Sequence, residues 1–184
     1  TAGLIGAIVG ALIGGSITDG LGRRKVLILS GVIFGVGALW SGMASSAVSL
    51  MLARLFLGVA IGTASFAVPL YIAEISPTKV RGTLVSLFQL MITIGILVSY
   101  FSDFMFADEA DPQCWRPMFY VGVIPALILL VGMIFMPESP RWLFANGSDE
   151  EAMKVLAKTE GGDAEDVATA IKGEILKDKA NTSS

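Results

Sequence analysis

The stretch from Arg54 to Trp142 places a few polar segments in a chain that is otherwise apolar. It reads RLFLGVAIG at 54–62, PLYIAEISPTKVRG at 69–82 and PESPRW at 137–142, and Gln89 lies in the apolar run between the last two. Charged residues persist among membrane-spanning residues only where structure or function requires them, because burying them in hydrocarbon is costly. The positions of these charges therefore guide the interpretation of the rest of the sequence.

Composition indicates a membrane protein. The 184 residues are 54% hydrophobic and 16% charged, with a mean hydropathy of +0.73, whereas soluble domains are about 45–50% apolar. Several apolar stretches have close to the ~20 residues that a helix needs to cross the hydrocarbon core. These stretches cover about 1–18, 26–44, 48–73, 83–102 and 117–136. We therefore expect an all-α membrane protein, with a partial transmembrane bundle over residues 1–144 and a cytoplasmic helical segment over 145–184.

Missing residue types argue against several functions. The chain has no histidine and one cysteine, Cys114, which removes the commonest general base and the usual nitrogen and sulfur ligands of metals. The formal net charge of −3 gives no reason to expect a nucleic-acid partner. We expect no enzymatic activity, no cofactor and no metal site.

The charges of the loops predict an orientation in the membrane. Basic residues occur in alternate loops, at Arg23, Arg24, Lys25, Lys79, Arg81 and from Arg141 onward, whereas segment 103–111 carries Asp103, Asp108, Glu109 and Asp111. By the positive-inside rule the basic loops are cytoplasmic, so residue 1 is expected outside and residues 137–184 inside. Thr1 is not an initiator methionine, and a cytoplasmic N-terminus would need one more span. We therefore expect a fragment of a longer protein.

Two polar residues are expected at membrane depth. Arg54 lies about six residues, or about 9 Å, from the outer end of its span, and an arginine there costs at least ~2.5–3.5 kcal/mol on insertion scales. We expect its partner on a helix before residue 1, although the side chain could instead extend to the outer headgroups. The Gln89 amide could bind a neutral polyhydroxylated ligand, or it could bond only to a neighbouring helix.

Other charges lie at the expected cytoplasmic ends of the helices. Asp19 sits near a helix C-terminus, where the helix dipole disfavours a carboxylate, so a specific partner such as Arg23 is expected. The remaining charges could latch helices together or stay as solvated charges worth little. They are Glu74, Arg81, Glu138 and Arg141.

Packing can also be predicted at both ends of the chain. Gly6, Gly10 and Gly14 recur every four residues, which provides a smooth helix face for a close neighbour. After the membrane spans, Ser148 and Glu151 predict a capping box that opens a short amphipathic helix. A second helix is expected over about 163–178, with one apolar face. That face consists of Val167, Ile171 and Ile175.

Four signatures resemble the sugar porter family of the major facilitator superfamily. They are Gly15-x-x-x-Asp19-x-x-Gly22-Arg23-Arg24, Arg54-x-x-x-Gly58-x-x-x-Gly62, Pro69-x-Tyr71-x-x-Glu74-x-x-Pro77-x-x-x-Arg81-Gly82 and Pro137-Glu138-Ser139-Pro140-Arg141. The first occurs across the superfamily, and the last two together are specific to sugar porters. The resemblance implies helices two to six of the N-terminal half and the start of the intracellular helices. The first helix and the C-terminal half would be missing partners.

The resemblance also implies a function and roles for individual residues. It implies transport of a monosaccharide by alternating access, with a proton as the coupling ion; a uniporter, or a sugar-sensing receptor on the same scaffold, is the alternative. The expected location is the plasma membrane, such as a bacterial inner membrane. Gln89 and Ile92 would contact the sugar, and Arg54 would pair with an aspartate of the first helix. A cytoplasmic gating network would comprise Asp19, Arg23, Arg24, Glu74, Arg81, Glu138 and Arg141.

Overall fold

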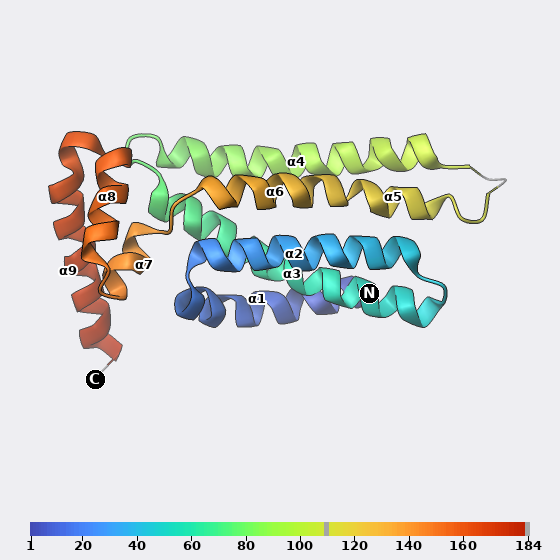
Figure 1. Cartoon of the computed structure of the whole chain (residues 1–184), viewed down its shortest axis with the longest axis horizontal. Helices are drawn as coiled ribbons and strands as arrows, with labels where there is room; N and C mark the ends of the chain where they lie inside the picture. Colours follow the sequence, from blue (N-terminus) through green and yellow to red (C-terminus); the bar gives the residue numbers. More distant parts are fainter. Residues whose placement is uncertain (109–110, 183–184) are drawn as a thin grey trace.

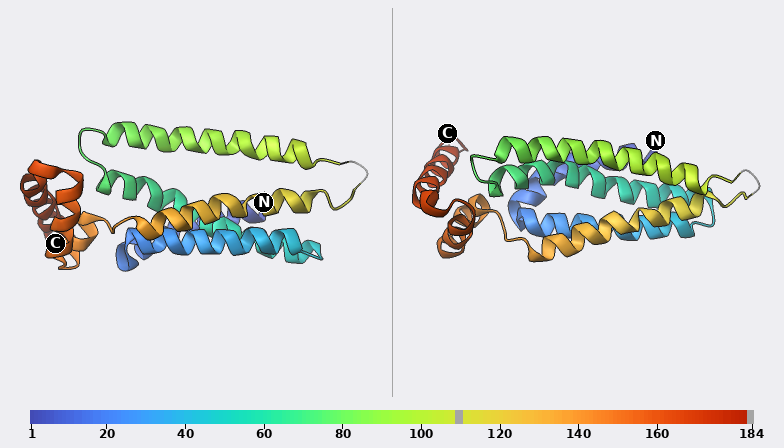
Figure 2. Two further views of the ribbon diagram at one scale, coloured as in Figure 1. Left: turned by 45° about the horizontal axis from the view of Figure 1, so that its top comes forward. Right: turned by 90° about the horizontal axis from the view of Figure 1, so that it is seen from above.

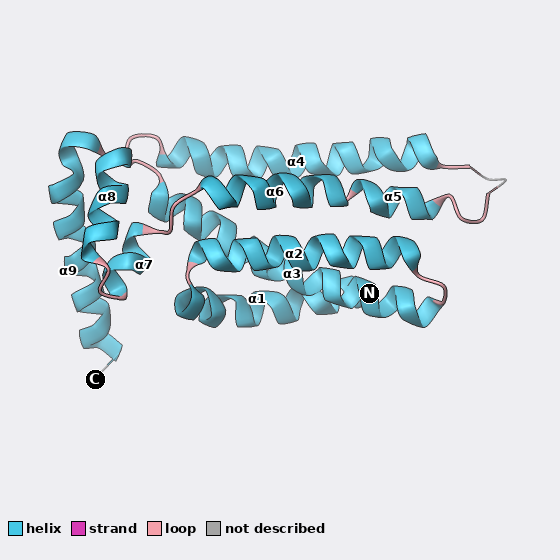
Figure 3. Ribbon diagram, in the orientation of Figure 1, coloured by secondary structure: helices cyan, strands magenta, loops and turns pink. Residues whose placement is uncertain are grey.

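The structure, a computed structural model, describes residues 1–108 and 111–182. Within these residues it contains helices, turns and loops but no strand (Figure 3). The segments that are long and apolar enough to cross a membrane are α1 (Ala2–Leu21), α2 (Arg23–Met43), α3 (Ala47–Ile75), α4 (Arg81–Phe106) and the pair α5 (Trp115–Val121) and α6 (Val123–Phe135). The expected all-α membrane fold is confirmed. Glu109, which was expected in an acidic loop, lies outside the described residues.

The fifth span differs from the continuous helix that was expected. It is interrupted at Gly122, which separates α5 from α6. Pro125 has no N–H to donate to the carbonyl of Val121, so the regular hydrogen-bond ladder fails at this point. The N–H of Gly122 instead bonds to the carbonyl of Phe119 at 3.1 Å, the tighter i to i−3 pattern.

The glycine face of α1 packs directly on the backbone of α3. A Cβ placed on Gly10 would lie 2.2 Å from the carbonyl oxygen of Val59, and one on Gly62 would lie 2.0 Å from the carbonyl oxygen of Ala7. No side chain fits between the two helices at these points. The predicted close packing is confirmed, and its partner is α3.

Helix α4 has few neighbours in the described structure. Figure 2 (left) shows it standing apart from the other spans over much of its length. Within α4, all of which is described, Ser102 is the one buried residue. The helix carrying Gln89 and Ile92 therefore presents most of its surface outward.

The C-terminal helices α7 (Pro140–Ala145), α8 (Asp149–Thr159) and α9 (Ala164–Thr182) lie across one end of the bundle (Figure 1). They share an apolar cluster that includes Leu143, Phe144 and Leu156. The predicted apolar face of α9 packs against this cluster through Val167, Ile171 and Ile175.

The starts of α7 and α8 differ from what the sequence predicted. Ser148 is the N-cap of α8 as expected, but among the described residues its side chain makes no capping hydrogen bond, so the expected capping box is absent. Helix α7 was not expected. Its N-cap, Ser139, accepts a bond from the N–H of Trp142 at 3.4 Å, and Pro140 occupies the first helical position, which suits proline.

Candidate functional site

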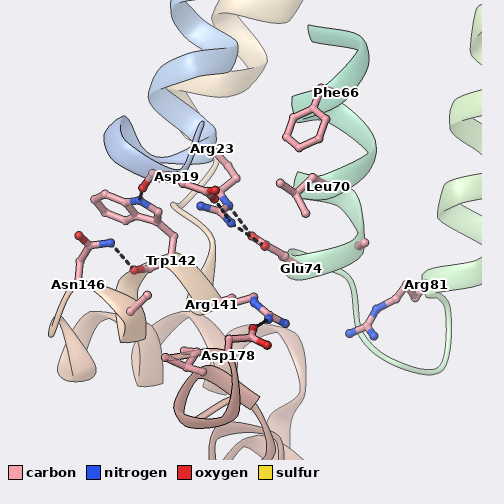
Figure 4. A pocket seen from close by; sticks show the side chains of 13 residues that line it. Asp19, Arg23, Phe66, Leu70, Glu74, Arg81, Arg141, Trp142, Asn146 and Asp178 are labelled. Atoms are coloured by element: carbon pink, nitrogen blue, oxygen red, sulfur yellow. Dashed lines mark hydrogen bonds and ion pairs between the residues drawn. The ribbon is translucent and has the colours of Figure 1, made fainter. Parts of the chain in front are cut away.

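The centre of the candidate site is Arg23, the first residue of α2. Its Nε and Nη2 donate to the two carboxylate oxygens of Glu74 on α3, at 2.9 and 3.1 Å. Its Nη1 reaches the carbonyl of Thr18 at 3.2 Å, and Asp19 lies 3.1 Å away (Figure 4). The Arg23 and Glu74 side chains are only 9% and 8% exposed. The two-point pair joins α2 to α3, and the contacts of Arg23 with Thr18 and Asp19 add α1. Arg23 is thus the partner that was expected for Asp19.

Glu74 also receives a bond from the segment after α6. The buried hydroxyl of Ser139 donates to its carboxylate. Nearby, the hydroxyl of Tyr71, one helical turn before Glu74, donates to the carbonyl of Pro137 at 2.6 Å. Tyr71 and Ser139 were not identified as site residues from sequence. The signal was available, because both lie inside the quoted signatures and a buried tyrosine hydroxyl usually needs a hydrogen-bond partner.

Arg24 caps the end of α6, and Glu138, which follows α6, caps the start of α2. The Arg24 guanidinium donates to the carbonyls of Met133 and Ile134 at 3.0 and 2.8 Å, which belong to the last turn of α6. One carboxylate oxygen of Glu138 accepts the backbone N–H of Arg24 at 2.9 Å, at the start of α2, and that of Ser139 at 3.0 Å. A cation at a helix C-terminus and an anion at an N-terminus are both favoured by the helix dipole.

Gly22, between α1 and α2, allows Glu138 to come this close. Its φ of 98° lies in the region that favours glycine, and a Cβ there would meet a Glu138 carboxylate oxygen at 2.5 Å. On the other side of the turn, the indole N–H of Trp142 donates to the carbonyl of Asp19 at 2.9 Å. The first and last signatures of the sequence are therefore in contact in the folded chain.

Arg141 and Arg81, the other two residues of the predicted network, are not in this cluster. Arg141 pairs with Glu174 and Asp178 on α9, at 2.8 and 2.9 Å. Arg81 makes one long contact, 3.5 Å to the carbonyl of Ser76, and its buried Nε has no hydrogen-bond partner among the described residues. Both arginines line a cavity of about 750 Å³ with Asp19, Arg23 and Glu74 (Figure 4).

At membrane depth, the sequence-predicted residues are separated from this cluster. Arg54 is exposed and forms no ion pair within the described part of the chain; its Cζ lies 4.4 Å from the centroid of the Phe119 ring on α5. Gln89 is exposed, and its amide forms no hydrogen bond among the described residues. Ile92 lines an apolar cavity of about 270 Å³ between α4 and the other spans, which Gln89 does not line.

Among the residues that the structure describes, no group of three or more histidine, cysteine or carboxylate side chains is placed to hold an ion. The chemistry available here is that of buried ion pairs and helix capping.

Comparison with known proteins identifies the family. The model of the family described as sugar (and other) transporter matches residues 2–184. The galactose-proton symporter of Escherichia coli (strain K12) is 43% identical over 162 residues, covering 88% of this chain and 34% of the symporter. The glucose transporter GlcP of Staphylococcus epidermidis is 47% identical over 156 residues, covering 85% and 34%. The chain thus spans about a third of the length of these relatives.

Solved structures agree with this assignment. The xylose transporter XylE from E. coli, in a partially occluded inward open conformation, has a TM-score of 0.88 to this fold at 32% identity, covering 97% of this chain and 48% of that chain. A second XylE structure, of a major facilitator superfamily proton:xylose symporter bound to 6-bromo-6-deoxy-D-glucose, has a TM-score of 0.87. The chain therefore belongs to the sugar porter family of the major facilitator superfamily, a family of multi-pass membrane transporters and not of enzymes.

Proposed function

We propose that this chain forms most of the N-terminal half of a monosaccharide carrier that works by alternating access. In this mechanism two halves move against each other around a central substrate, so each half has to behave as a rigid body. The cluster of Arg23, Arg24, Glu74 and Glu138 supports this, because it fastens α1, α2, α3, α6 and the segment before α7 to one another at one end. The first helix and the C-terminal half would complete the carrier.

Gln89 is the observation that carries the substrate proposal. An amide on a largely apolar helix, exposed and without an internal hydrogen bond in the described residues, is suited to bind sugar hydroxyls. Ile92, one turn later, would contribute apolar contact. Relatives that are named for glucose, galactose and xylose transport support the class of ligand.

We propose that charged residues at the end of the spans next to α7–α9 take part in gating. Arg23, Arg24, Glu74 and Glu138 satisfy one another within this half, so their role is to hold its shape. Asp19, whose side chain is 72% exposed, and Arg81 retain the capacity to bind groups of the other half when this side closes. Arg141 would act through α9, where it is already paired.

Proton coupling is proposed for Arg54. In the described residues its guanidinium has no carboxylate, which leaves it able to pair with an aspartate on the helix that precedes residue 1. Protonation of that carboxyl would release the arginine. The same lack of a visible carboxylate makes uniport the second candidate.

We propose the plasma membrane as the location, with residue 1 outside and residues 137–184 in the cytoplasm. The basic residues of the turn at 22–25 and of the segment from Arg141 support this orientation through the positive-inside rule.

Uptake into proteoliposomes tests the function. The full-length protein would be supplied with a panel of labelled monosaccharides, with and without an inward proton gradient. We expect uptake of at least one sugar and stimulation of that uptake by the gradient. Uptake at the same rate with and without the proton gradient would favour uniport. The absence of uptake of any sugar would contradict the proposed function.

Gln89→Ala tests the substrate site separately. Loss of the amide removes hydrogen bonds worth about 0.5–1.5 kcal/mol each, so the Kd for the transported sugar should rise roughly three- to tenfold while unfolding is unchanged. The measurement is equilibrium binding of the labelled sugar. Leu97→Ala, which trims another exposed side chain of α4 (68% exposed), is the matched control and should bind like the parent. An unchanged Kd in Gln89→Ala would remove Gln89 from the site.

A further inference from the structure

The contact between Arg54 and Phe119 joins two helices at membrane depth. Arg54 lies seven residues after the first residue of α3, or about 11 Å along its axis. Its guanidinium carbon is 4.4 Å from the centre of the Phe119 ring on α5. The face of an aromatic ring attracts a cation through its quadrupole, and the attraction grows where water is excluded. Among the residues that the structure describes, the ring of Phe119 thus provides a contact that stabilises the charge of Arg54.

The ring of Phe119 is itself held in place by its neighbours. Trp115 meets it edge to face, with ring centroids 5.9 Å apart and an interplanar angle of 77°. The Arg116 guanidinium lies 5.1 Å from the Trp115 ring and donates to the carbonyls of Gly42 and Ala44 at 3.2 and 3.0 Å, at the C-terminal end of α2. These contacts connect Phe119, through Trp115 and Arg116, to the turn between α2 and α3.

The charges around Arg54 would not compete with the ring for it. The charged residue of α5 is Arg116, a cation, and α2 has its charged residues at its other end. The described acidic residues on this side of the spans are Asp103, Asp108 and Asp111, at the end of α4 and in the segment that leads to α5. Within the described residues no carboxylate lies within 4 Å of the guanidinium.

We propose that Phe119 is a positioning residue for Arg54. The face of the Phe119 ring holds the guanidinium while Arg54 has no carboxylate partner, and this contact sets how readily Arg54 binds a carboxylate. For transport this rests on the proposed function, in which a carboxylate binds Arg54 when ionised and releases it when protonated. Stacking on Phe119 stabilises the released arginine, which is the state with the carboxyl protonated. The ring therefore favours the released arginine, and removing the ring favours the pair with the carboxylate.

A double-mutant cycle tests the contact without reference to transport. The full-length protein would be unfolded in detergent, at a pH acidic enough to protonate the coupling carboxyl, as the parent, as Arg54→Met, as Phe119→Leu and as the double variant. We expect the double variant to lose clearly less than the sum of the two single losses, because each substitution removes the same contact. Additive losses would overturn the proposal, whatever the transport assays show.

The pH dependence of uptake tests the consequence. Given the usual strength of such contacts, Phe119→Leu should shift the midpoint of the pH profile of gradient-driven uptake downward by roughly half a unit, and Phe119→Trp should restore it because the ring face is kept. Phe56→Leu, which removes a ring of α3 that stacks on Trp40 instead, is the matched control and should not shift the midpoint. A midpoint unmoved by Phe119→Leu would overturn the proposed effect on coupling. If the parent shows no gradient dependence, the symport proposal fails and the unfolding cycle alone decides whether Phe119 holds Arg54.

Discussion

At the scale of single residues, the exchange between Arg24 and Glu138 explains charges that look misplaced in the sequence. Arg24 stands at the start of α2, where the helix dipole disfavours a cation. Its side chain, however, extends to the last carbonyls of α6, where a cation is favoured, and Glu138 takes the N-terminal position of α2 in its place. Arg24 therefore satisfies carbonyls at the end of α6, and Glu138 satisfies an N–H group at the start of α2, which the helices themselves leave without a partner.

Glu138→Ala should show how much these capping contacts contribute to the stability of the fold. The N–H groups of Arg24 and Ser139 would lose their acceptor, and leaving such groups unsatisfied costs about 1–3 kcal/mol. We expect a loss of that size in the free energy of unfolding, measured by denaturant titration in detergent with tryptophan fluorescence. Glu150→Ala is the control, because Glu150 is 85% exposed and pairs with Lys154, a contact worth about 0.5 kcal/mol or less. Equal losses in the two variants would contradict the capping role.

At the scale of helices, the contact between α1 and α3 depends on the absence of side chains. Gly6 and Gly10 on one helix, and Gly58 and Gly62 on the other, each face a backbone carbonyl that a Cβ would approach to between 2.0 and 2.2 Å. In a bilayer, apolar side chains gain little by leaving lipid, so helices associate through such close packing. The two helices thus hold together because their backbones touch.

Gly10→Ala should separate α1 from α3. One methyl group would lie 2.2 Å from the Val59 carbonyl oxygen, so a backbone has to move, and overpacking of this kind costs about 1–3 kcal/mol. We expect a lower thermal unfolding midpoint in detergent. Gly132→Ala in α6 is the matched control: no described atom lies within 4 Å of its added methyl group, and alanine is the better helix former by roughly 1 kcal/mol. A destabilised Gly132→Ala, or an unaffected Gly10→Ala, would argue against this packing.

What the sequence could predict followed from local rules. Apolar composition and length predicted long membrane-spanning helices, the glycine spacing indicated the close face of α1, and the dipole argument required a partner for Asp19. The partners of Arg24 and Glu138 could not be predicted, because they lie more than a hundred residues apart along the chain. The contact of Arg54 with Phe119 was also missed, because a phenylalanine in an apolar span carries no pattern that distinguishes it.

At the scale of the whole molecule, the two ends of the spans differ in chemistry. One end carries the buried ion pairs and the helices α7–α9, and the other carries the turn between α2 and α3 and the segment leading to α5 (Figure 1). The proposed topology places the first end in the cytoplasm. Cys114, the one cysteine of the sequence, lies half-buried at the second end, directly before α5. It is a native reporter of orientation.

Labelling of Cys114 should reveal which side of the membrane this end faces. In intact cells expressing the full-length protein, with any cysteines outside this chain replaced, a membrane-impermeant maleimide should modify Cys114, because the positive-inside rule places the loop before α5 outside. The matched variant carries Cys114→Ser and Glu150→Cys, which moves the thiol to an exposed site on α8, and should react only after the membrane is permeabilised. The reverse pattern would invert the topology and would place Asp19 and Arg81 at the outer surface, where they could not close the cytoplasmic side.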